Sequence, residues 1–462
     1  MESKIQTWTW IALALLVLAA TAGRWVSADH LANPRYNPAN RLSGDEVVYI
    51  VLGDRIWKEG RYDTRGVAAQ LPLDRDRVVI PAYLEASMFK HPPMFPFLVG
   101  LSRFLFWGIE GSSIYPSLLM GAISLLALFW LALEVGCSPG QGLLAVLLLA
   151  VSPVHWICSS RIWMDVTLMT FILLAVAAQV RASGRENWWK WSGFFWGCAL
   201  LTKYTAFAAW AFAMAAALLL RPELRRNRRF WIGQAVAALM FLPWLVCRFW
   251  FEGGTVLMFW TSKVEDWQTF ALMSRRAWLL LPLAGLAWLW LRCSKQAWFG
   301  GVVSGSRFVA WGTLVFLALV LAMGDRLSFG TVPWSGWAPN ELRNSPKDFY
   351  LTHSLLFEPV CWWGLIGLLA FRREAAWDMA RAVWLGLFLF LTLWGNFQSR
   401  YGLPLEPFEI LFSAALLMPR GSCTAAGGRW VCLLPVAWIL FSCARSLWIV
   451  SQIAIPNQFF YF

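Results

Sequence analysis

Long runs of apolar residues recur along almost the whole of this 462-residue chain, and they constrain its fold more than any other feature. Hydrophobic residues make up 59% of the sequence and charged residues only 14%, and the mean hydropathy is +0.55. A water-soluble domain could not cover so much apolar surface, whereas membrane-spanning helices expose it to lipid. The sequence therefore predicts an all-α polytopic membrane protein.

About 11–13 segments are long and apolar enough to cross a bilayer, which takes roughly 17–25 residues of helix. The first is expected near 7–27, and a long polar segment, 28–93, follows it. Later spans are expected near 113–135, 140–158, 165–182, 191–203, 205–220, 230–250, 277–292, 308–324, 354–371, 382–398, 402–418 and 429–451. The apolar stretch 94–109 is short and contains Pro96 and Arg103, so it predicts a helix along the membrane surface.

Basic residues gather in loops that would share one side of the membrane, within a net charge of +13. They are Arg181, Arg185, Lys190, Arg221, Arg225, Arg226, Arg228, Arg229, Arg372 and Arg373. Lys and Arg favour cytoplasmic loops, and these loops fall on the same side as the N-terminus. The loop 251–276 falls on the other side of the membrane. It also carries basic residues, but its acidic residues offset part of their charge. We therefore expect a cytoplasmic N-terminus and place the 28–93 loop outside the cytoplasm.

Several classes of function are disfavoured by the composition and by missing motifs. Nucleic-acid binding needs a basic soluble domain, which the apolar runs leave no room for. The nine cysteines are scattered, without a C-x-x-C pair or metal-ligand spacing, so they are typical of buried apolar side chains. No P-loop, dinucleotide-binding glycine pattern, H-E-x-x-H or G-x-S-x-G motif occurs in its required context, which argues against nucleotide-driven transport and serine hydrolysis.

Two adjacent carboxylates, Asp45 and Glu46, follow the first predicted span. Apolar residues recur after them at helical spacing, so the segment 44–58 predicts an amphipathic helix. Ser43 and Glu46 have the S-x-x-E spacing of a capping box, so one interpretation is that the carboxylates only cap this helix. The other is that the helix start holds Asp45 in one orientation, which suits a general base.

The Lys90-His91-Pro92-Pro93 segment precedes the predicted surface helix. The two prolines fix the direction in which the chain enters that helix. Lys90 and His91 then lie at the level of the lipid head groups. Lys90 could simply extend its charge to the interface, or both residues could bind a lipid phosphate.

Three further charged motifs fall at the same, outer ends of predicted spans. Arg161 and Asp165 are four residues apart and could pair with one another. Lys203 lies in the turn between two apolar spans, where a lone charge is costly and usually has a role or a partner. Arg400 and Tyr401 lie at the outer end of a late span.

In this order the motifs resemble the GT-C superfamily of membrane glycosyltransferases, and most closely the protein O-mannosyltransferase and aminoarabinose–lipid A transferase group with its bacterial relatives. The matching residues are Asp45-Glu46 with Tyr49, Lys90-His91-Pro92-Pro93, Arg161 with Asp165, Thr202-Lys203, Pro243-Trp244 and Arg400-Tyr401. The motifs cover about residues 1–410. The resemblance implies a catalytic transmembrane module over 1–418, whose first extracytoplasmic loop is 28–110, and a C-terminal transmembrane segment over 419–462.

Two departures from the family pattern stand out. Relatives often have an arginine where the first span after Pro-Pro begins, and here the sequence is Ile114-Tyr115-Pro116-Ser117. The Trp-Trp-Asp motif of the oligosaccharyltransferase catalytic subunit does not occur, which argues against that branch.

The resemblance implies a polyprenyl-phosphate sugar as donor and inversion at the anomeric carbon. Transfer to an extracytoplasmic glycan, lipid or protein would take place in a bacterial inner membrane, on its outer side. Asp45 is then the best candidate for the base, with Glu46 and Asp165 as further catalytic candidates. The phosphate side would use Lys90, His91, Lys203 and Arg400, with Tyr401, Arg161 and Tyr49 around it. A divalent ion between Asp45, Glu46 and Asp165 is also compatible with the sequence.

Two other classes of function remain open on sequence alone. A transporter or flippase of lipid-linked sugars would favour ionisable residues at mid-membrane and repeated halves, whereas the notable charges here cluster at span ends. A non-catalytic scaffold would not account for acidic and basic motifs that converge on one face.

Overall fold

The computed structural model describes residues 6–32, 44–64, 91–252, 359–370, 374–394, 399–418 and 429–453, and every regular element in these ranges is a helix. The first half contains α1 (Thr7–Ala32), α2 (Gly44–Glu59), α4 (Met94–Leu105), η2 (Glu110–Ile114), α5 (Tyr115–Glu134), α6 (Pro139–Val151), α7 (Pro153–Ser159), α8 (Asp165–Ala182), α9 (Trp188–Leu200), α10 (Ala206–Leu220), η3 (Pro222–Arg226) and α11 (Arg228–Glu252). The second half contains α17 (Cys361–Ala370), α18 (Ala375–Trp394), α19 (Ser399–Gly402), α20 (Glu406–Leu417) and α21 (Arg429–Ile453). The all-α prediction is confirmed. The spans expected at 277–292 and 308–324, and the candidate Lys90, lie outside the described residues.

Four of the described helices are long and apolar enough to cross a membrane: 7–28, 111–134, 165–182 and 228–247. The pair α6 and α7 makes a fifth if it counts as one span. Shorter apolar helices include Met94–Leu105 and Ala206–Leu220. The chain is therefore an integral membrane protein, as the sequence predicts.

The segment 140–158, expected as one span, is broken into α6 and α7, which meet at 66°. Pro153 permits the break, because its ring disfavours the preceding helical turn and it has no amide proton to donate to that turn. Ser152 starts the new helix by accepting a hydrogen bond from the His155 amide at 3.3 Å. The chain that leaves α7 is thereby directed toward the start of α8.

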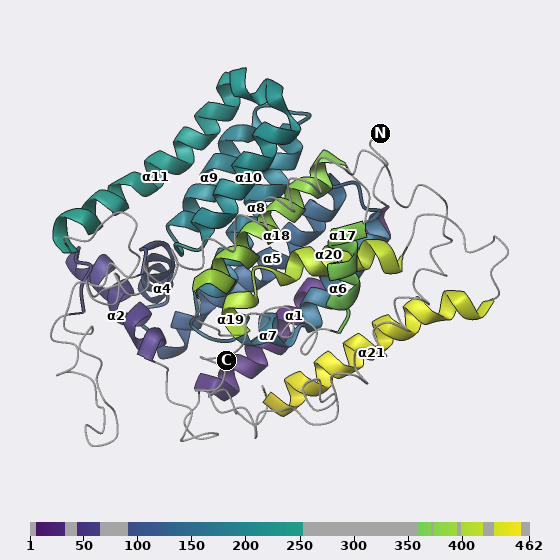
Figure 1. Cartoon of the computed structure of the whole chain (residues 1–462). Coiled ribbons are helices and arrows are strands. Elements are labelled where there is room, and N and C mark those ends of the chain that lie inside the picture. The colour runs from purple at the N-terminus through teal and green to yellow at the C-terminus, as the bar shows by residue number, and fades with distance from the viewer. Residues whose placement is uncertain are drawn as a thin grey trace.

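Most of the buried residues lie in a bundle built on α5, α8, α9 and α11, with α10 and α18 packed beside it (Figure 1). Glycine permits a close crossing between α9 and α11. A Cβ added at Gly193 would lie 1.9 Å from the Gly233 carbonyl oxygen. α1 flanks this bundle and leaves large apolar side chains such as Ile11, Leu15 and Leu18 more than half exposed, as expected for a lipid-facing helix.

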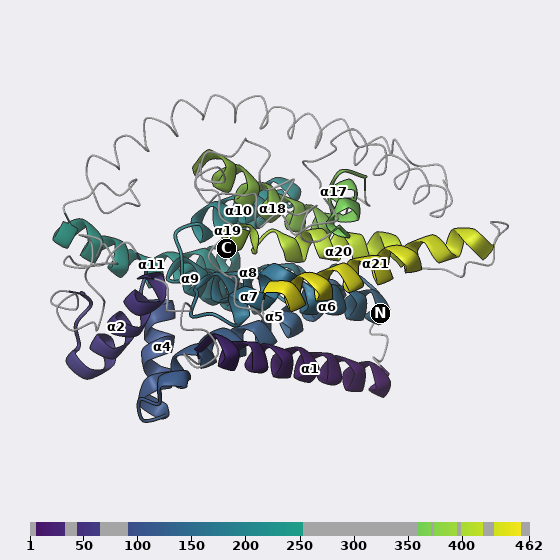
Figure 2. The ribbon, with the colours of Figure 1, turned by 90° about the horizontal axis from the view of Figure 1, so that it is seen from below.

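α2 and α4 lie at one end of the bundle, and Figure 2 shows α4 running across the direction of α1. The two helices cross at Gly53 and Gly100, where a Cβ on Gly53 would lie 2.6 Å from the Pro96 carbonyl oxygen. Buried side chains from both helices, including Leu52 and Val99, form a small separate core. A helix is thus present where the surface helix was expected, and it packs against α2.

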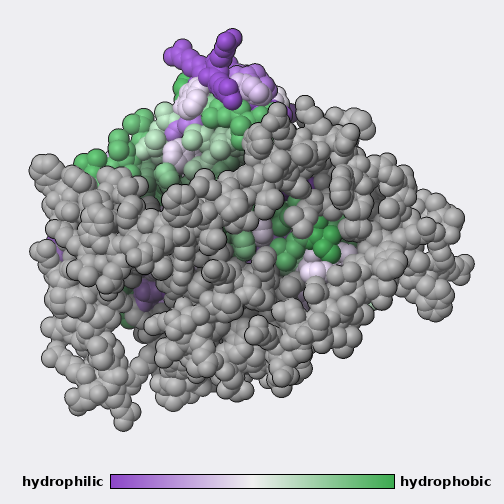
Figure 3. Space-filling model, in the orientation of Figure 1, coloured by the Kyte–Doolittle hydropathy of each residue, from purple (hydrophilic) through white to green (hydrophobic). Residues whose placement is uncertain are grey.

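The opposite end of the bundle is the turn from α10 through η3 to α11. A hydrophilic projection stands there above a hydrophobic flank of the molecule (Figures 1 and 3). The exposed residues of this turn include Arg225, Arg226, Arg228 and Arg229. The two ends therefore differ in chemistry: one carries α2 and α4, and the other carries the strongest basic loop.

Candidate active site

Three ion pairs join the sequence-predicted acids to the sequence-predicted bases at the α2 end of the bundle. They are Asp45 with Arg400, Glu46 with Arg161, and Asp165 with Lys203. The six residues come from α2, the loop between α7 and α8, the first turn of α8, the α9–α10 turn, and α19. Because every pair links segments far apart in the sequence, the candidate site exists only in the folded chain.

Asp45 is the most exposed of the three carboxylates. Its Oδ2 accepts a hydrogen bond from the Arg400 guanidinium at 2.7 Å, and its side chain remains 25% exposed. The corresponding values are 1% for Glu46 and 2% for Asp165. Asp45 also lies in the first turn of α2, where the helix dipole favours a negative charge. An incoming molecule could therefore reach this carboxylate while the protein fixes its direction.

Glu46 points the other way and is buried. Its Oε1 accepts hydrogen bonds from the Arg161 Nε at 2.9 Å and from the Ile162 amide at 3.1 Å, and Oε2 accepts from the same guanidinium. These contacts tie the start of α2 to the loop between α7 and α8. The alternative of a capping box with Ser43 stays untested, because Ser43 lies outside the described residues. Glu46 serves as an anchor in this structure.

Asp165 and Lys203 form the second buried anchor, with Nζ 2.6 Å from Oδ1. The four-residue spacing suggests that Arg161 pairs with Asp165. In the structure, Arg161 instead pairs with Glu46, and Asp165 pairs with Lys203. The physical reason is that α7 ends at Ser159 and α8 begins at Asp165, so no single helix carries both residues. The Lys203 ammonium also lies 3.9 Å from the centroid of the Tyr401 ring.

Trp163 is a part of the site that the sequence motifs did not single out. The Arg400 guanidinium lies 4.9 Å from its ring centroid, and the Arg161 guanidinium lies 5.6 Å from it. An aromatic face attracts a cation and needs no charge of its own to do so. Its place inside the Arg161–Asp165 motif was the only available signal in the sequence.

Arg400 therefore has both an ion pair with Asp45 and contacts with the Trp163 and Tyr401 rings. Burial lowers the pKa of its guanidinium, but the neighbouring Tyr401 and Asp45 raise it, and the pKa ends well above the ordinary value. The site consequently keeps a permanent positive charge beside Asp45. Such a group suits a phosphate better than a proton-transfer role.

His91 joins the site from the side of α4. The Tyr62 hydroxyl donates to its carbonyl oxygen at 2.6 Å, and its ring meets the Tyr49 ring edge-on at 5.2 Å. The Met94 amide donates to the Leu201 carbonyl at 2.9 Å, which fixes this segment against the α9–α10 turn. Burial, and then the charge of Asp45, raise the pKa of the Tyr49 phenol well above its usual value, so Tyr49 is neutral here.

The divalent-ion hypothesis does not fit the carboxylates as placed. Within the described ranges, no group of three or more His, Cys, Asp or Glu side chains is arranged to hold a metal ion. Each of the three carboxylates is instead neutralised by a basic side chain. We therefore derive no chemical step from a metal between Asp45, Glu46 and Asp165.

A buried polar network behind the site was also missed by the motif analysis. The Arg24 guanidinium of α1 donates to the His155 Nδ1 at 2.6 Å, and the His155 Nε2 lies 2.8 Å from the Ser124 hydroxyl. Ser152 donates to Glu406 at 2.8 Å. Ionisable residues inside apolar runs are the signal that could have identified Arg24 and Glu406. The network fixes the bend between α6 and α7, and with it the loop that carries Arg161.

Comparison with known proteins bears on the fold and on the family that the chain resembles. A family model described as dolichyl-phosphate-mannose-protein mannosyltransferase matches residues 90–247, a range that contains His91, Arg161, Asp165 and Lys203. No curated protein matches the chain in sequence.

Solved structures share the fold at low sequence identity. ArnT from Cupriavidus metallidurans bound to undecaprenyl phosphate is similar with a TM-score of 0.58 and 13% identity, over 98% of this chain and 78% of that one. The archaeal oligosaccharyltransferase AglB from Archaeoglobus fulgidus, in complex with an inhibitory peptide and a dolichol-phosphate, is similar with a TM-score of 0.55 and 16% identity. That match covers 98% of this chain, which spans only 56% of the archaeal protein.

The fold defines a class: a membrane protein with the GT-C fold of the glycosyltransferases. The resemblance stated from the motifs is thereby confirmed, with the mannosyltransferase family model over 90–247 as its more specific support. The missing Trp-Trp-Asp motif argues against the oligosaccharyltransferase branch. Because the chain is similar in fold to both solved structures, the comparison does not test that prediction.

Proposed function

We propose that the protein is an inverting glycosyltransferase that moves a sugar from a polyprenyl-phosphate donor to an acceptor outside the cytoplasm. The observation that carries the proposal is the partly exposed Asp45 carboxylate bound to Arg400, with Lys203 and His91 nearby. The family match and the fold support the class of reaction. The basic loops at the other end of the bundle support an outward-facing site in a bacterial inner membrane.

In the proposed reaction, Asp45 takes the proton of an acceptor hydroxyl while that oxygen forms a bond to the anomeric carbon. The bond from this carbon to the phosphate oxygen breaks on the opposite face, and the lipid phosphate leaves with the electron pair. A positioned base of this kind contributes roughly 10²–10⁴-fold in rate. The acceptor is a hydroxyl of a glycan, lipid or protein.

Arg400 links the two halves of the reaction. As Asp45 gains a proton, it loses the charge that held the guanidinium, while the departing phosphate gains one. The guanidinium can then stabilise the phosphate without leaving its place between Trp163 and Tyr401. Lys203 and His91 complete the phosphate side, and Lys90 stays a candidate from the sequence.

The remaining candidates have positioning roles in this proposal. Glu46 and Arg161 hold the α2 start against the α7–α8 loop, and Asp165 orients Lys203. Tyr49 supports His91 as a neutral, buried ring. Loss of any of these residues would act through the geometry of Asp45, Arg400 or Lys203.

Mass spectrometry of extracytoplasmic glycans and glycolipids, with and without the gene for this chain, tests the proposal. We expect one sugar-bearing product to disappear without the protein and to return when it is restored. An accompanying accumulation of the polyprenyl-phosphate sugar would identify the donor. An unchanged set of products would contradict the proposal and favour a transporter or a scaffold.

A further inference from the structure

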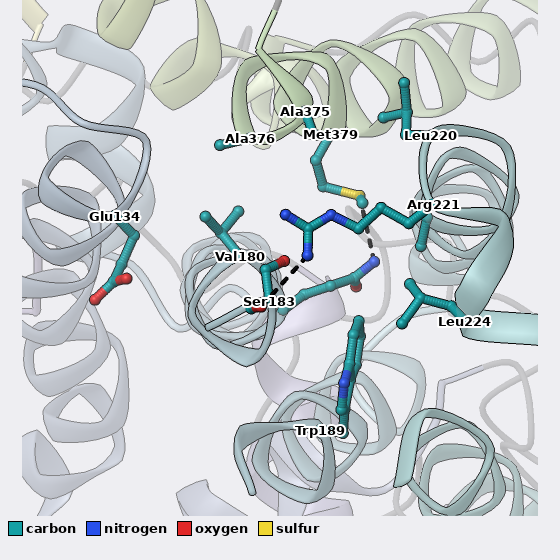
Figure 4. A pocket seen from close by; sticks show the side chains of 12 residues that line it. Glu134, Val180, Ser183, Trp189, Leu220, Arg221, Leu224, Ala375, Ala376 and Met379 are labelled. Atoms are coloured by element: carbon teal, nitrogen blue, oxygen red, sulfur yellow. Dashed lines mark hydrogen bonds between the residues drawn. The ribbon is translucent and has the colours of Figure 1, made fainter. Parts of the chain in front are cut away.

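A cavity lies at the end of the bundle opposite the candidate active site (Figure 4). Its volume is about 220 Å³, and α5, α8, α9, α10, η3 and α18 all contribute to its walls. α8 begins at Asp165 in the active site and ends beside this cavity. At 1.5 Å per residue, its 18 residues put the two sites about 27 Å apart, close to the thickness of a bilayer core.

The lining combines polar and apolar side chains. Arg221, Ser183, Glu134 and Gln179 are its polar members, and Figure 4 shows the Arg221 side chain reaching across the space toward Ser183. The apolar members include Val180, Ala217, Leu220, Leu224 and Met379. A lining with both a charged side chain and apolar side chains fits a molecule with a charged head group and an apolar body.

The charge inside the cavity is positive. Arg221 makes one recorded hydrogen bond, to the Ser183 carbonyl at 3.5 Å, and no carboxylate in the described ranges pairs with it. Glu134 is already neutralised, because it pairs with Arg181 and accepts a hydrogen bond from Trp130 at 2.9 Å. Arg221 is therefore the charge in the cavity that is available to a ligand.

The surroundings narrow the chemistry of that ligand. The adjoining turn exposes four more arginines, and Leu219, next to the lining residue Leu220, is 62% exposed on the flank of the bundle. Basic pockets between transmembrane helices at a membrane surface bind anionic lipid head groups. We propose that this cavity binds the phosphate head group of an anionic phospholipid of the leaflet opposite the active site. The inference is independent of the transfer reaction.

Lipid-dependent thermal unfolding of the delipidated full-length protein in detergent tests this site. Phosphatidylglycerol should raise the unfolding temperature more than phosphatidylcholine does. Arg221→Gln should weaken phosphatidylglycerol binding about tenfold or more, as loss of a hydrogen bond to a charged group predicts. Arg225→Gln is the matched control, since Arg225 is exposed on the same turn but does not line the cavity.

A second variant keeps the test decisive if Arg221→Gln does not fold. Ala376→Leu places a larger side chain on the cavity wall and should abolish the difference between the two lipids. Equal stabilisation by both lipids would overturn the proposal, as would an equal loss in Arg225→Gln. Inorganic phosphate reproducing the effect would identify a free-phosphate site instead of a lipid site.

Discussion

At the scale of single residues, Lys203 is the proposed phosphate contact whose role is most easily tested. It is paired with the buried Asp165 and lies over the Tyr401 ring. We expect Lys203→Ala to weaken binding of undecaprenyl phosphate, because one phosphate contact is lost. Lys203→Arg keeps the charge and should retain most of the affinity.

A binding assay in nanodiscs, with thermal unfolding measured alongside, separates this effect from a loss of stability. Lys203→Ala leaves the buried Asp165 carboxylate without its recorded partner, so the protein should also unfold at a lower temperature. Unchanged affinity for the lipid in a folded Lys203→Ala protein would remove Lys203 from the donor side.

The buried Tyr49 phenol makes folding stability depend on alkaline pH. Its folded pKa is raised above the ordinary value of 10.0, mainly by burial and then by Asp45. Its contribution is complete below the unfolded pKa and is lost as the pH rises from about 10 toward the folded pKa. We expect the unfolding temperature to fall above about pH 10. Tyr49→Phe should make this fall less steep, and an identical slope in the variant would contradict the explanation.

Sequence reasoning identified the charged residues of the site but not their pairing. Arg161 and Asp165 are neighbours in the sequence, yet each is paired with a residue from another segment. Local spacing predicts a contact only inside a continuous helix, and the break between α7 and α8 removes that condition. Trp163 was missed because a tryptophan in an apolar protein gives no signal until its neighbours are known.

At the scale of helices, the crossing of α2 and α4 sets the position of Asp45. We expect Gly53→Ala to push α2 away from α4, since the added Cβ would lie 2.6 Å from the Pro96 carbonyl oxygen and 2.7 Å from the Gly100 amide nitrogen. A displacement of about 1 Å at the catalytic group can cost on the order of 100-fold in rate. The bundle itself should remain folded.

Gly111→Ala is the matched control for this prediction, because a Cβ at Gly111 meets nothing within 4 Å. Transfer rates of the two variants, with circular dichroism as a check on folding, give the comparison. Equal rates in Gly53→Ala and the parent would show that the α2–α4 contact does not position Asp45.

Four of the expected spans, those near 7–27, 113–135, 165–182 and 230–250, were predictable from composition because each is an apolar run as long as a bilayer requires. The bend inside 140–158 was not predicted, although Pro153 signalled it, since prolines also occur within unbroken membrane helices. α11 and α21 contain such prolines, Pro243 and Pro435. The bend at Pro153 is stabilised by contacts among Ser152, His155 and Glu406. These contacts form only in the tertiary structure, so the sequence alone does not reveal them.

At the scale of the whole molecule, the active-site end and the basic end lie at opposite faces of one bundle. A reagent added on one side of the membrane should therefore reach only the residues at that end of the bundle. Arg225→Cys should gain label from a membrane-impermeant thiol reagent only when the cytoplasmic face is accessible, and Glu59→Cys only from the outer face. Both measurements are read against the parent protein, which contains the exposed Cys247.

The reverse labelling pattern would place the candidate active site in the cytoplasm. It would leave the fold unchanged but contradict an extracytoplasmic acceptor.

The central claim is that the Asp45 carboxylate acts as the base in sugar transfer, and its replacement by an amide tests this most directly. Asp45→Asn keeps the size of the side chain and should slow transfer at least about 100-fold, whereas undecaprenyl phosphate should still bind. Glu59→Gln, an exposed change on the same helix, should leave the rate unchanged. Near-normal transfer by a folded Asp45→Asn protein would contradict the account.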